Sequence, residues 1–313
     1  MNTVVKAPDD ASNEPCFLGM DVGGTQTRWA LATSTGALIA EGVAEGFSGM
    51  GLVLAHESEV IGCRLNAIAQ MARGAQQHRR LSGLQAGVTG IGTDAPQLVS
   101  MIARAFNLDD HQVRVTSDAE LSFHAVLAPG EGYLVYAGTG SIAAFIDAAG
   151  VLHRAGGRGV SLDDAGGGYW IAREALRRIW RREDEQPGAW HNSPMARALF
   201  AIVGGKSSAF SARYLMEKAR GESGMLARTV AEHASDDALA AEVLTDAGTE
   251  LARLANAMSH RYGKRAIVVA GRASQLHPLI ESAMRRAMPA DAAIEFRQVQ
   301  AHIAAAKMAA RSG

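Results

Sequence analysis

The chain has 313 residues, of which 48% are hydrophobic, and this length is enough for two domains of ordinary size. Its 31 Lys and Arg residues are balanced by 32 Asp and Glu residues, so that the formal net charge is −1. This balance gives no electrostatic footprint for nucleic acid or for an anionic membrane, and no apolar run reaches the ~18–20 residues that span a bilayer.

Cysteine usage and the first residues indicate the compartment. Cys16 and Cys63 are the only two cysteines, and they form neither a C-x-x-C pair nor a cluster with histidine. A structural zinc site and a cysteine-held iron–sulfur cluster within one chain are therefore not expected. Residues 1–15 are polar and acidic without an apolar core, which predicts a frayed leader rather than a secretion signal, in a reduced, cytoplasmic protein.

The first predicted elements surround a turn rich in glycine and threonine. Residues 17–33 read FLGMDVGGTQTRWALAT, in which two apolar strands flank the segment 21–27. Taken alone, such a segment is typical of the tight turn of a β-hairpin. It is also a candidate phosphate cradle, since backbone N–H and hydroxyl groups in a turn bind anions. A further turn at Gly36 leads to a third strand.

The remaining elements of the first half alternate between helix and strand, which indicates α/β layers rather than a helix bundle. The segment LAPGEG, residues 127–132, places proline and glycine between periodic segments and is the best domain boundary. The pattern before it predicts a helix around 51–73, a strand over 84–90, a helix near 96–105, and a strand over 113–117 that runs into a helix from Asp118.

An internal repeat gives the first turn more weight. Residues 138–156 match residues 24–42 without a gap, at a constant offset of 114 residues (residue 138 against residue 24). A hairpin turn needs a glycine, but it does not need the same Gly-Thr-x-Ser/Thr in both copies. The repeat predicts two related halves, and two donor-rich turns suit a polyphosphate held between two lobes, so the phosphate interpretation is favoured. The identical positions are Gly24, Thr25, Ala30, Gly36, Leu38 and Gly42, against Gly138, Thr139, Ala144, Gly150, Leu152 and Gly156.

The second half continues with helices and strands. Its first helix is predicted from helical periodicity over residues 166–182. After it the pattern predicts a mostly helical region over 190–260, a strand over 266–271, a helix from Pro278, a strand over 292–297 and a closing helix from about 299.

Five motifs, in this order and spacing, resemble those of the sugar-kinase/Hsp70/actin superfamily. Within it the chain is similar to the BadF/BadG/BcrA/BcrD ATPase family, specifically its N-acetylglucosamine and glucosamine kinase branch, from about residue 17 to 310. The motifs are Asp21-Val22-Gly23-Gly24-Thr25, Ser117-Asp118-Ala119, Ala137-Gly138-Thr139-Gly140-Ser141, Gly166-Gly167-Gly168-Tyr169-Trp170 and Ala270-Gly271-Arg272.

The resemblance implies an α/β fold of two RNase-H-like (actin-like ATPase) lobes, with a nucleotide at the bottom of the cleft and substrate above it. The first lobe would cover residues 16–127, and the second would cover 128–298 with a helical insertion. The closing helix, about 299–313, would pack back on the first lobe. ATP and Mg²⁺ are the implied cofactors, and a small-molecule sugar is the implied substrate. We expect no nucleic-acid or membrane partner and a homodimer, although the sequence itself does not give the oligomeric state.

The same resemblance assigns nucleotide-binding roles residue by residue. Asp21 is similar to the acid that positions Mg²⁺ through water and is the expected metal site. Gly271 lies in the loop that would border adenosine. The residues expected to face phosphate are Gly23, Gly24, Thr25 and Thr27 in the first turn, and Gly138, Thr139, Gly140 and Ser141 in the second.

Asp118 matches the catalytic aspartate, and there is an independent physical case for it. Phosphoryl transfer requires positioning, charge neutralisation and a carboxylate that accepts the proton of the attacking hydroxyl. An aspartate that follows a strand and opens a helix sits at the carboxyl edge of the sheet, where open α/β sheets place ligands. The alternative is a helix N-cap, which aspartate also makes well. With both phosphate turns present, the catalytic interpretation is favoured.

The expected sugar-binding residues include departures from the family pattern. Asp164 is retained and could hold a sugar hydroxyl, but the glutamate that commonly follows it is Ala165 here. A Gly-Trp-Gly that is common in the family is replaced by Gly157-Arg158-Gly159, and we expect Ser48 to substitute in part for a missing asparagine. Together with Thr139, these residues form the candidate sugar site: Ser48, Thr139, Gly157, Arg158 and Asp164.

Arg158 has two interpretations. It could form a salt bridge with Asp163 or Asp164, which is favoured because these acids are close in sequence. Alternatively, its guanidinium could face the sugar pocket and offer a fork of donors to a carboxylate or a sugar oxygen.

Three functions compete at this point. The leading hypothesis is an ATP- and Mg²⁺-dependent kinase that phosphorylates a hydroxyl, expected to be O6, of an amino sugar such as N-acetylglucosamine or glucosamine. The second is a sugar-sensing ATPase-like protein without transfer activity, motivated by Ala165 and the altered sugar loop. The third is a nucleotide-switched activator of a dehydratase. Activators of this kind hold an iron–sulfur cluster at a dimer interface through paired cysteines in the second half of the chain, and this function is disfavoured because both cysteines here precede residue 64.

Overall fold

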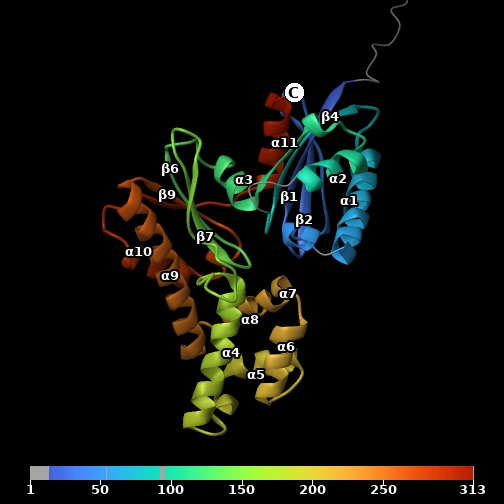
Figure 1. Ribbon diagram of the computed structural model, residues 1–313. Coiled ribbons are helices and arrows are strands. Elements are labelled where there is room, and N and C mark those ends of the chain that lie inside the picture. Colours follow the sequence, from blue (N-terminus) through green and yellow to red (C-terminus); the bar gives the residue numbers. More distant parts are fainter. Residues whose placement is uncertain (1–13, 54, 92–95, 313) are drawn as a thin grey trace, which may run out of the picture. The chain divides into compact units, whose positions relative to one another are not determined.

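A computed structural model describes residues 14–53, 55–91 and 96–312 (Figure 1). The expected leader lies outside the described residues except for Glu14 and Pro15, and Pro15 already begins the first strand. The chain divides into two compact units, one formed by residues 1–121 and 300–313 and the other by residues 122–299. This division falls inside helix α3 (Asp118–His124), before the segment 127–132 that we expected to be the boundary.

The first unit is built on a five-stranded sheet in the order β3-β2-β1-β4-β5. Strand β1 is antiparallel to β2 and parallel to β4, and β4 is parallel to β5. The strand predicted over 84–90 begins earlier and ends at Val88, because Gly90 has a positive φ of 69° that turns the chain. The strands are β1 (Pro15–Val22), β2 (Gln26–Thr33), β3 (Leu38–Glu45), β4 (Arg80–Val88) and β5 (Val113–Ser117).

Alternation along β1 gives this sheet two buried faces. Leu18, Met20 and Val22 belong to the core that also contains apolar residues of α1 (Ala55–Ala75) and α2 (Pro96–Phe106). In place of the single helix predicted around 51–73, the structure has two elements, a short 3-10 helix, η2 (Gly49–Val53), and α1.

The opposite face of the same sheet is covered by α11 (Ala301–Ser312), as Figure 1 shows. A Cβ atom added at Gly19 would lie 2.1 Å from both the Ala306 nitrogen and the His302 carbonyl oxygen. The backbone of α11 thus approaches β1 so closely that only glycine fits there. Ala30 on β2 packs against Ala306 beside this contact. The last helix of the chain therefore completes the first sheet.

The second unit repeats the arrangement of the first sheet. Its five strands have the order β10-β9-β6-β7-β8, with β6 antiparallel to β7 and parallel to β9. Gly36 and Gly150 have φ values of 82° and 81°, and the amides of both donate to a carbonyl three residues earlier at 2.9 Å. The predicted internal repeat is therefore confirmed in backbone geometry. The strands are β6 (Gly132–Ala137), β7 (Ser141–Ile146), β8 (Leu152–Gly156), β9 (Ala266–Ala270) and β10 (Ile294–Phe296).

The helices of the second unit enclose its main core. Tyr133, Val135 and Ala137 of β6 belong to one core cluster with α4 and α9, and the alternate residue Leu134 packs with Phe123 in a smaller one. The region predicted to be mostly helical over 190–260 is confirmed. The helices are α4 (Gly168–Glu185), α5 (Pro194–Val203), α6 (Ser208–Glu217), α7 (Arg220–Gly224), α8 (Leu226–Glu232), α9 (Ala238–Tyr262) and α10 (Pro278–Arg286), with 3-10 helices η4 (Ala189–Asn192) and η5 (Ala273–Gln275). The 3-10 helix η3 (Asp110–Gln112) belongs to the first unit, before β5.

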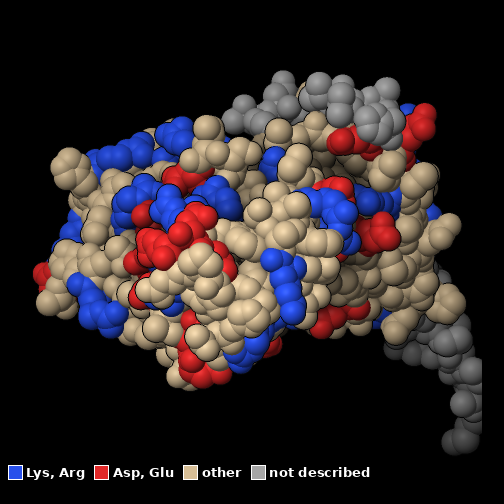
Figure 2. Space-filling model, turned by 90° about the horizontal axis from the view of Figure 1, so that it is seen from below, with Lys and Arg blue, Asp and Glu red and all other residues tan. Residues whose placement is uncertain are grey.

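One face of the molecule carries charges of both signs. On the face shown in Figure 2, basic and acidic side chains are interspersed among uncharged ones. Within residues 14–53, 55–91 and 96–312, none of the helices combines the length and the apolar character that crossing a bilayer requires.

The two cysteines are expected to react very differently with a thiol reagent. Cys16 is buried in β1, and burial raises its pKa from 9.0 to about 11, whereas Cys63 is exposed on α1. Two pKa units correspond to about 100-fold less thiolate at neutral pH, and the thiolate is the reactive form. Mass spectrometry of the native protein after iodoacetamide treatment should show one adduct, at Cys63. A Cys63→Ser variant that still reacts rapidly without denaturant would contradict this prediction.

Candidate active site

In the first unit, three candidate groups follow the carboxyl ends of adjacent parallel strands. Strands β1, β4 and β5 end at Val22, Val88 and Ser117, and they are followed by the first glycine turn, Thr89 and Asp118. The Thr89 amide donates to the Val22 carbonyl at 2.9 Å, which ties the ends of β1 and β4 together. The sheet therefore brings these groups to one edge of the unit, where open α/β sheets bind ligands.

Two backbone amides of the first glycine turn have no hydrogen-bond acceptor among the described residues. The Gly23 amide donates to the Gln26 carbonyl and the Thr25 carbonyl accepts from the Gly46 amide, both at 3.0 Å. Gly24 and Thr25 are exposed, and their own amides donate to no group in the described part of the chain. A Cβ atom added at Gly24 would meet nothing within 4 Å. The turn thus presents two uncommitted N–H groups to solvent, as an anion-binding turn requires.

Two residues near this turn differ from expectation. Thr27 is fully buried and its hydroxyl donates to the Glu45 carbonyl at 3.1 Å, so that proton is not available to a phosphate oxygen. The sequence interpretation had also missed the role of Gly46, where an added Cβ would lie 2.0 Å from the Gly23 carbonyl oxygen. The absence of a side chain at Gly46 therefore allows the residue after β3 to pack directly against the backbone of the turn.

Asp21, the expected magnesium ligand, is partly exposed on β1, opposite Arg28 and Gly87 in the strand register.

Asp118 is the first residue of α3, but it does not cap the helix. The Ser117 hydroxyl accepts the Glu120 amide at 3.1 Å, which is the N-cap bond, while the Asp118 side chain accepts the adjacent Ala119 amide at 2.9 Å. The capping interpretation of Asp118 is therefore wrong, because Ser117 takes that role. Burial raises the pKa of Asp118 above its ordinary value, and hydrogen bonds from the Thr89 hydroxyl and the Ala119 amide oppose this effect.

Ser48 is connected to the same edge of the first sheet by a hydrogen bond to Thr89. Its hydroxyl donates to the Thr89 carbonyl and accepts the Met50 amide, both at 3.4 Å, and the Gly49 amide donates to the same carbonyl at 2.9 Å. Thr89 therefore links Ser48, β1 and Asp118. Sequence reasoning did not single out Thr89, although its position directly after a strand that runs parallel to β1 is a signal of that edge.

The second glycine turn, in the other unit, is oriented by the start of α4. The Gly138 and Thr139 carbonyls accept the Gly168 and Tyr169 amides at 2.8 and 3.0 Å. Because a trans peptide directs its N–H opposite to its carbonyl, the Thr139 and Gly140 amides point away from α4. Neither amide donates to a group among the described residues. The second turn thus has the same feature as the first, two uncommitted N–H groups.

The hydroxyl of Ser141 is committed elsewhere. It is buried and donates to the Ala165 carbonyl at 2.6 Å, so it joins two loops of the second unit instead of facing a ligand. Gly271 has a φ of 95°, and an added Cβ would lie 2.3 Å from the Ala137 carbonyl oxygen. The loop after β9 therefore lies directly against the end of β6, next to the second turn.

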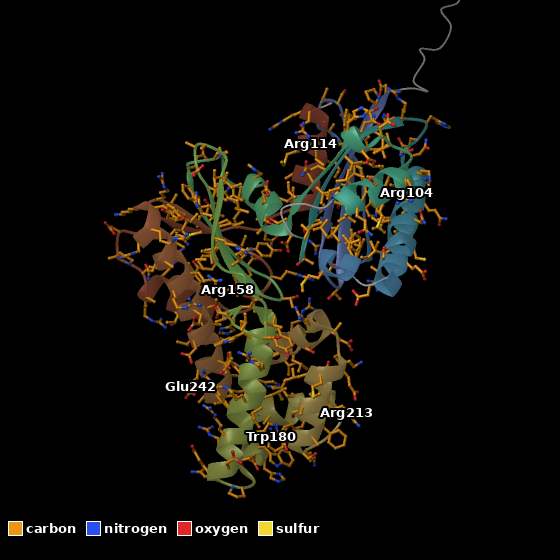
Figure 3. All side chains as sticks on the ribbon, viewed as in Figure 1. Arg104, Arg114, Arg158, Trp180, Arg213 and Glu242 are labelled. Carbon is orange, nitrogen blue, oxygen red and sulfur yellow. The ribbon has the colours of Figure 1, made fainter. Side chains whose placement is uncertain are left out.

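The loop that carries Arg158 is rich in left-handed backbone. Gly157 and Gly159 have φ values of 62° and 91°, and an added Cβ at Gly157 would lie 2.6 Å from Ile142 Cδ1. Arg158 is exposed between them, near the start of α4 (Figure 3). The structure contradicts the expected salt bridge: Asp163 pairs with Arg253 at 3.1 Å, and Arg158 makes no ion pair within the described part of the chain.

The fold and the comparisons define the class of protein. Two five-stranded sheets of equivalent strand order form the two lobes of an RNase-H-like, actin-like fold. The family model of the BadF/BadG/BcrA/BcrD ATPase family matches residues 18–297, and the chain belongs to this family. No curated protein matches the chain.

Three solved structures illustrate the shared fold. A protein from Chromobacterium violaceum, provisionally named an N-acetylglucosamine kinase, has a TM-score of 0.71 and 22% identity, with 96% of this chain and 99% of that chain covered. A protein with the same provisional name from Porphyromonas gingivalis has a TM-score of 0.70 and 16% identity, covering 95% and 99%. A ROK family glucokinase from Streptomyces griseus, in complex with glucose and AMPPNP, has a TM-score of 0.62 and 17% identity, covering 95% and 100%.

Proposed function

We propose that this protein is an ATP-dependent sugar kinase that transfers a phosphoryl group to a hydroxyl, at O6, of an amino sugar such as N-acetylglucosamine or glucosamine. The observation that carries the proposal is the duplicated glycine turn, since each copy presents two uncommitted amides at equivalent places in the two sheets. Phosphate oxygens are the ligand that such amides suit. The names of the similar structures, two provisional N-acetylglucosamine kinases and a glucokinase, support the same class of reaction.

Asp118 favours transfer over mere nucleotide binding. Its carboxylate follows β5, is free of the capping role, and has its pKa raised by burial, which increases its affinity for a proton. A carboxylate of this kind can accept the proton of a sugar hydroxyl as that hydroxyl attacks the terminal phosphorus of ATP. The remaining phosphate-facing residues of the proposal are Gly23, Gly24, Thr25, Gly138, Thr139 and Gly140, with Gly271 beside the adenosine.

The residues present fit a nucleotide with its magnesium. Open space over Gly24 leaves room for a phosphate, and Asp21 would hold Mg²⁺ through water. No cluster of three His, Cys, Asp or Glu side chains that could ligate a metal directly occurs in the described residues, which suits an ion held mainly by phosphate oxygens and water. When bound, Mg²⁺ supplies neutralisation of phosphate charge.

The test is a coupled ADP-release screen with ATP and Mg²⁺ over glucose, glucosamine, N-acetylglucosamine and N-acetylmuramic acid. Sugar-dependent ADP release with a 6-phosphate identified by NMR supports the proposal. ATP binding by calorimetry with no transfer to any of these sugars would instead favour the sugar-sensing function motivated by Ala165. Gel filtration with light scattering tests the expected homodimer separately.

Thr89→Val should move the pH dependence of the kinase. Valine keeps the shape of threonine but removes the hydroxyl that lowers the pKa of Asp118. The pKa of Asp118 then rises further, so the acid limb of kcat/KM against pH should shift to higher pH, and activity should be lost first on the acid side. Thr89→Ser, which keeps the hydroxyl, is the matched control and should retain the wild-type profile. An unchanged limb in Thr89→Val would show that the hydroxyl does not act on the catalytic base.

Arg158→Trp should change which sugar is preferred. The guanidinium is exposed and has no ion-pair partner among the described residues, so it is available to a carboxylate or a strongly polar group of the substrate. We expect kcat/KM for N-acetylmuramic acid to fall relative to glucosamine and N-acetylglucosamine in this variant. Arg228→Trp, at an exposed position of α8, controls for the added indole. An unaltered order among the three sugars would remove Arg158 from substrate selection.

A further inference from the structure

Asp164 has an unusual backbone for its residue type. Its φ of 53° lies in the left-handed region, and the other positive-φ residues of this loop, Gly156, Gly157, Gly159 and Gly166, are all glycines. A side chain is held in this region only where the surroundings determine it, and aspartate tolerates it when its short carboxylate bonds to nearby amides. The contacts of Asp164 supply those bonds.

The carboxylate of Asp164 is committed to the Arg158 loop. One oxygen, Oδ1, accepts the Gly159 amide at 3.0 Å, and the Arg158 amide also bonds to the carboxylate. The residue as a whole is 8% exposed. Burial raises the pKa of Asp164, these amides oppose the rise, and the nearby charges of Asp163 and Arg220 act in opposite directions. These contacts give the Asp164 carboxylate a structural role in the loop, and its expected role as a sugar ligand stays a prediction.

The other carboxylate oxygen lies against the second glycine turn. A Cβ atom added at Gly140 would be 2.3 Å from Asp164 Oδ2, and the three nearest atoms to it all belong to Asp164. The Gly167 amide donates to the Asp164 carbonyl at 3.1 Å, and an added Cβ at Gly167 would lie 2.6 Å from the Gly140 carbonyl carbon. One side chain thus fills the space between the Arg158 loop and the turn whose amides face the nucleotide in the proposed function.

We propose that Asp164 is a positioning residue: it holds the Arg158–Gly159 segment against the turn 138–140 and thereby couples the sugar-facing loop to the phosphate-facing turn. This inference rests on the proposed function for its meaning, but its structural content, the coupling of the loop to the turn, can be measured without any sugar.

Two substitutions separate positioning from ligand binding. Asp164→Asn keeps the tolerance for left-handed backbone and one carbonyl oxygen that accepts an amide, but it removes the charge. Asp164→Gly keeps the backbone freedom and removes both acceptors. If Asp164 positions the loop, Asp164→Gly should weaken ATP binding and raise the sugar KM, each by about tenfold, because both segments lose their support. Asp164→Asn should rescue both quantities substantially. A sugar ligand would instead give a raised sugar KM in both variants with the ATP dissociation constant unchanged, which would overturn the proposal.

A double-mutant cycle with Gly140→Ala tests the contact itself. The added methyl should displace Asp164 and weaken ATP binding in the wild-type background, but it should cost little more in Asp164→Gly, where the three clashing atoms are gone. Calorimetry with the nonhydrolysable nucleotide AMPPNP measures this coupling, and circular dichroism checks that each variant is folded. Additive effects of the two substitutions would overturn the inference. Absence of sugar phosphorylation by the wild type would overturn only the proposed function, since the cycle is read from nucleotide binding.

Discussion

Asp118→Asn should lower kcat for sugar phosphorylation by a factor on the order of 10² or more while the fold and ATP binding stay intact. Asparagine can still accept the Ala119 amide, and the cap of α3 comes from Ser117, so the helix keeps its N-terminal bonds. What is lost is the group that takes a proton from the sugar hydroxyl. The measurements are kcat at saturating ATP and sugar, the ATP dissociation constant by calorimetry, and the circular dichroism spectrum.

Asp110→Asn provides the matched control, since Asp110 is an exposed aspartate of the same unit, before β5. It should keep the wild-type kcat. Retention of more than about a third of the wild-type kcat by Asp118→Asn would mean that the carboxylate is not the base, and transfer would then depend on positioning and electrostatics alone.

Gly24→Val should weaken ATP binding at least about tenfold without disturbing the protein. A side chain at this position meets no protein atom within 4 Å, so folding should tolerate it, but it occupies the space that phosphate oxygens need to reach the amides of Gly24 and Thr25. Calorimetry with ATP and Mg²⁺ gives the affinity, and thermal unfolding checks stability.

Gly62→Val is the matched control, because an added Cβ at Gly62 in α1 also meets nothing within 4 Å. Gly138→Val tests the second turn less cleanly, since its Cβ would lie 3.1 Å from the Tyr136 ring and the ring must move. Normal ATP affinity in Gly24→Val would show that the first turn only connects two strands of a hairpin and does not bind phosphate. Its similarity to the second turn would then be a feature of the fold without a shared function.

The sequence predicted the sheets well because the signals that define them are local and repeated. Alternation along β1, the glycines at Gly36 and Gly150, and the strand–helix junction at Asp118 each act within a few residues. The start of β4 was missed by four residues, since Arg80, Leu81 and Ser82 lack an apolar run. Arg80 and Leu81 are strand because they pair with Pro15 and Cys16 of β1. Strand pairing of this kind depends on a partner strand far away in the sequence.

The candidate site was predicted at the level of the backbone and less well for side chains. Both glycine turns lie where the repeat indicated, but the hydroxyls of Thr27 and Ser141 bond to carbonyls 18 and 24 residues away. Asp163 likewise pairs with Arg253, 90 residues further on, and leaves Arg158 without the expected bridge. A motif gives residue types and spacing, whereas these assignments depend on which distant groups the fold brings within hydrogen-bond distance.

The contact between Gly19 and α11 also sets an order of events during synthesis. Strand β1 leaves the ribosome first, and α11, which covers its Gly19 face, leaves only after residues 122–299 of the second unit. Ala30 and the backbone around Gly19 therefore stay uncovered until all residues of the second unit have been synthesised. A variant truncated before residue 301 would lack α11 and would leave Ala30 and Ala32 on this face of the first sheet exposed to solvent.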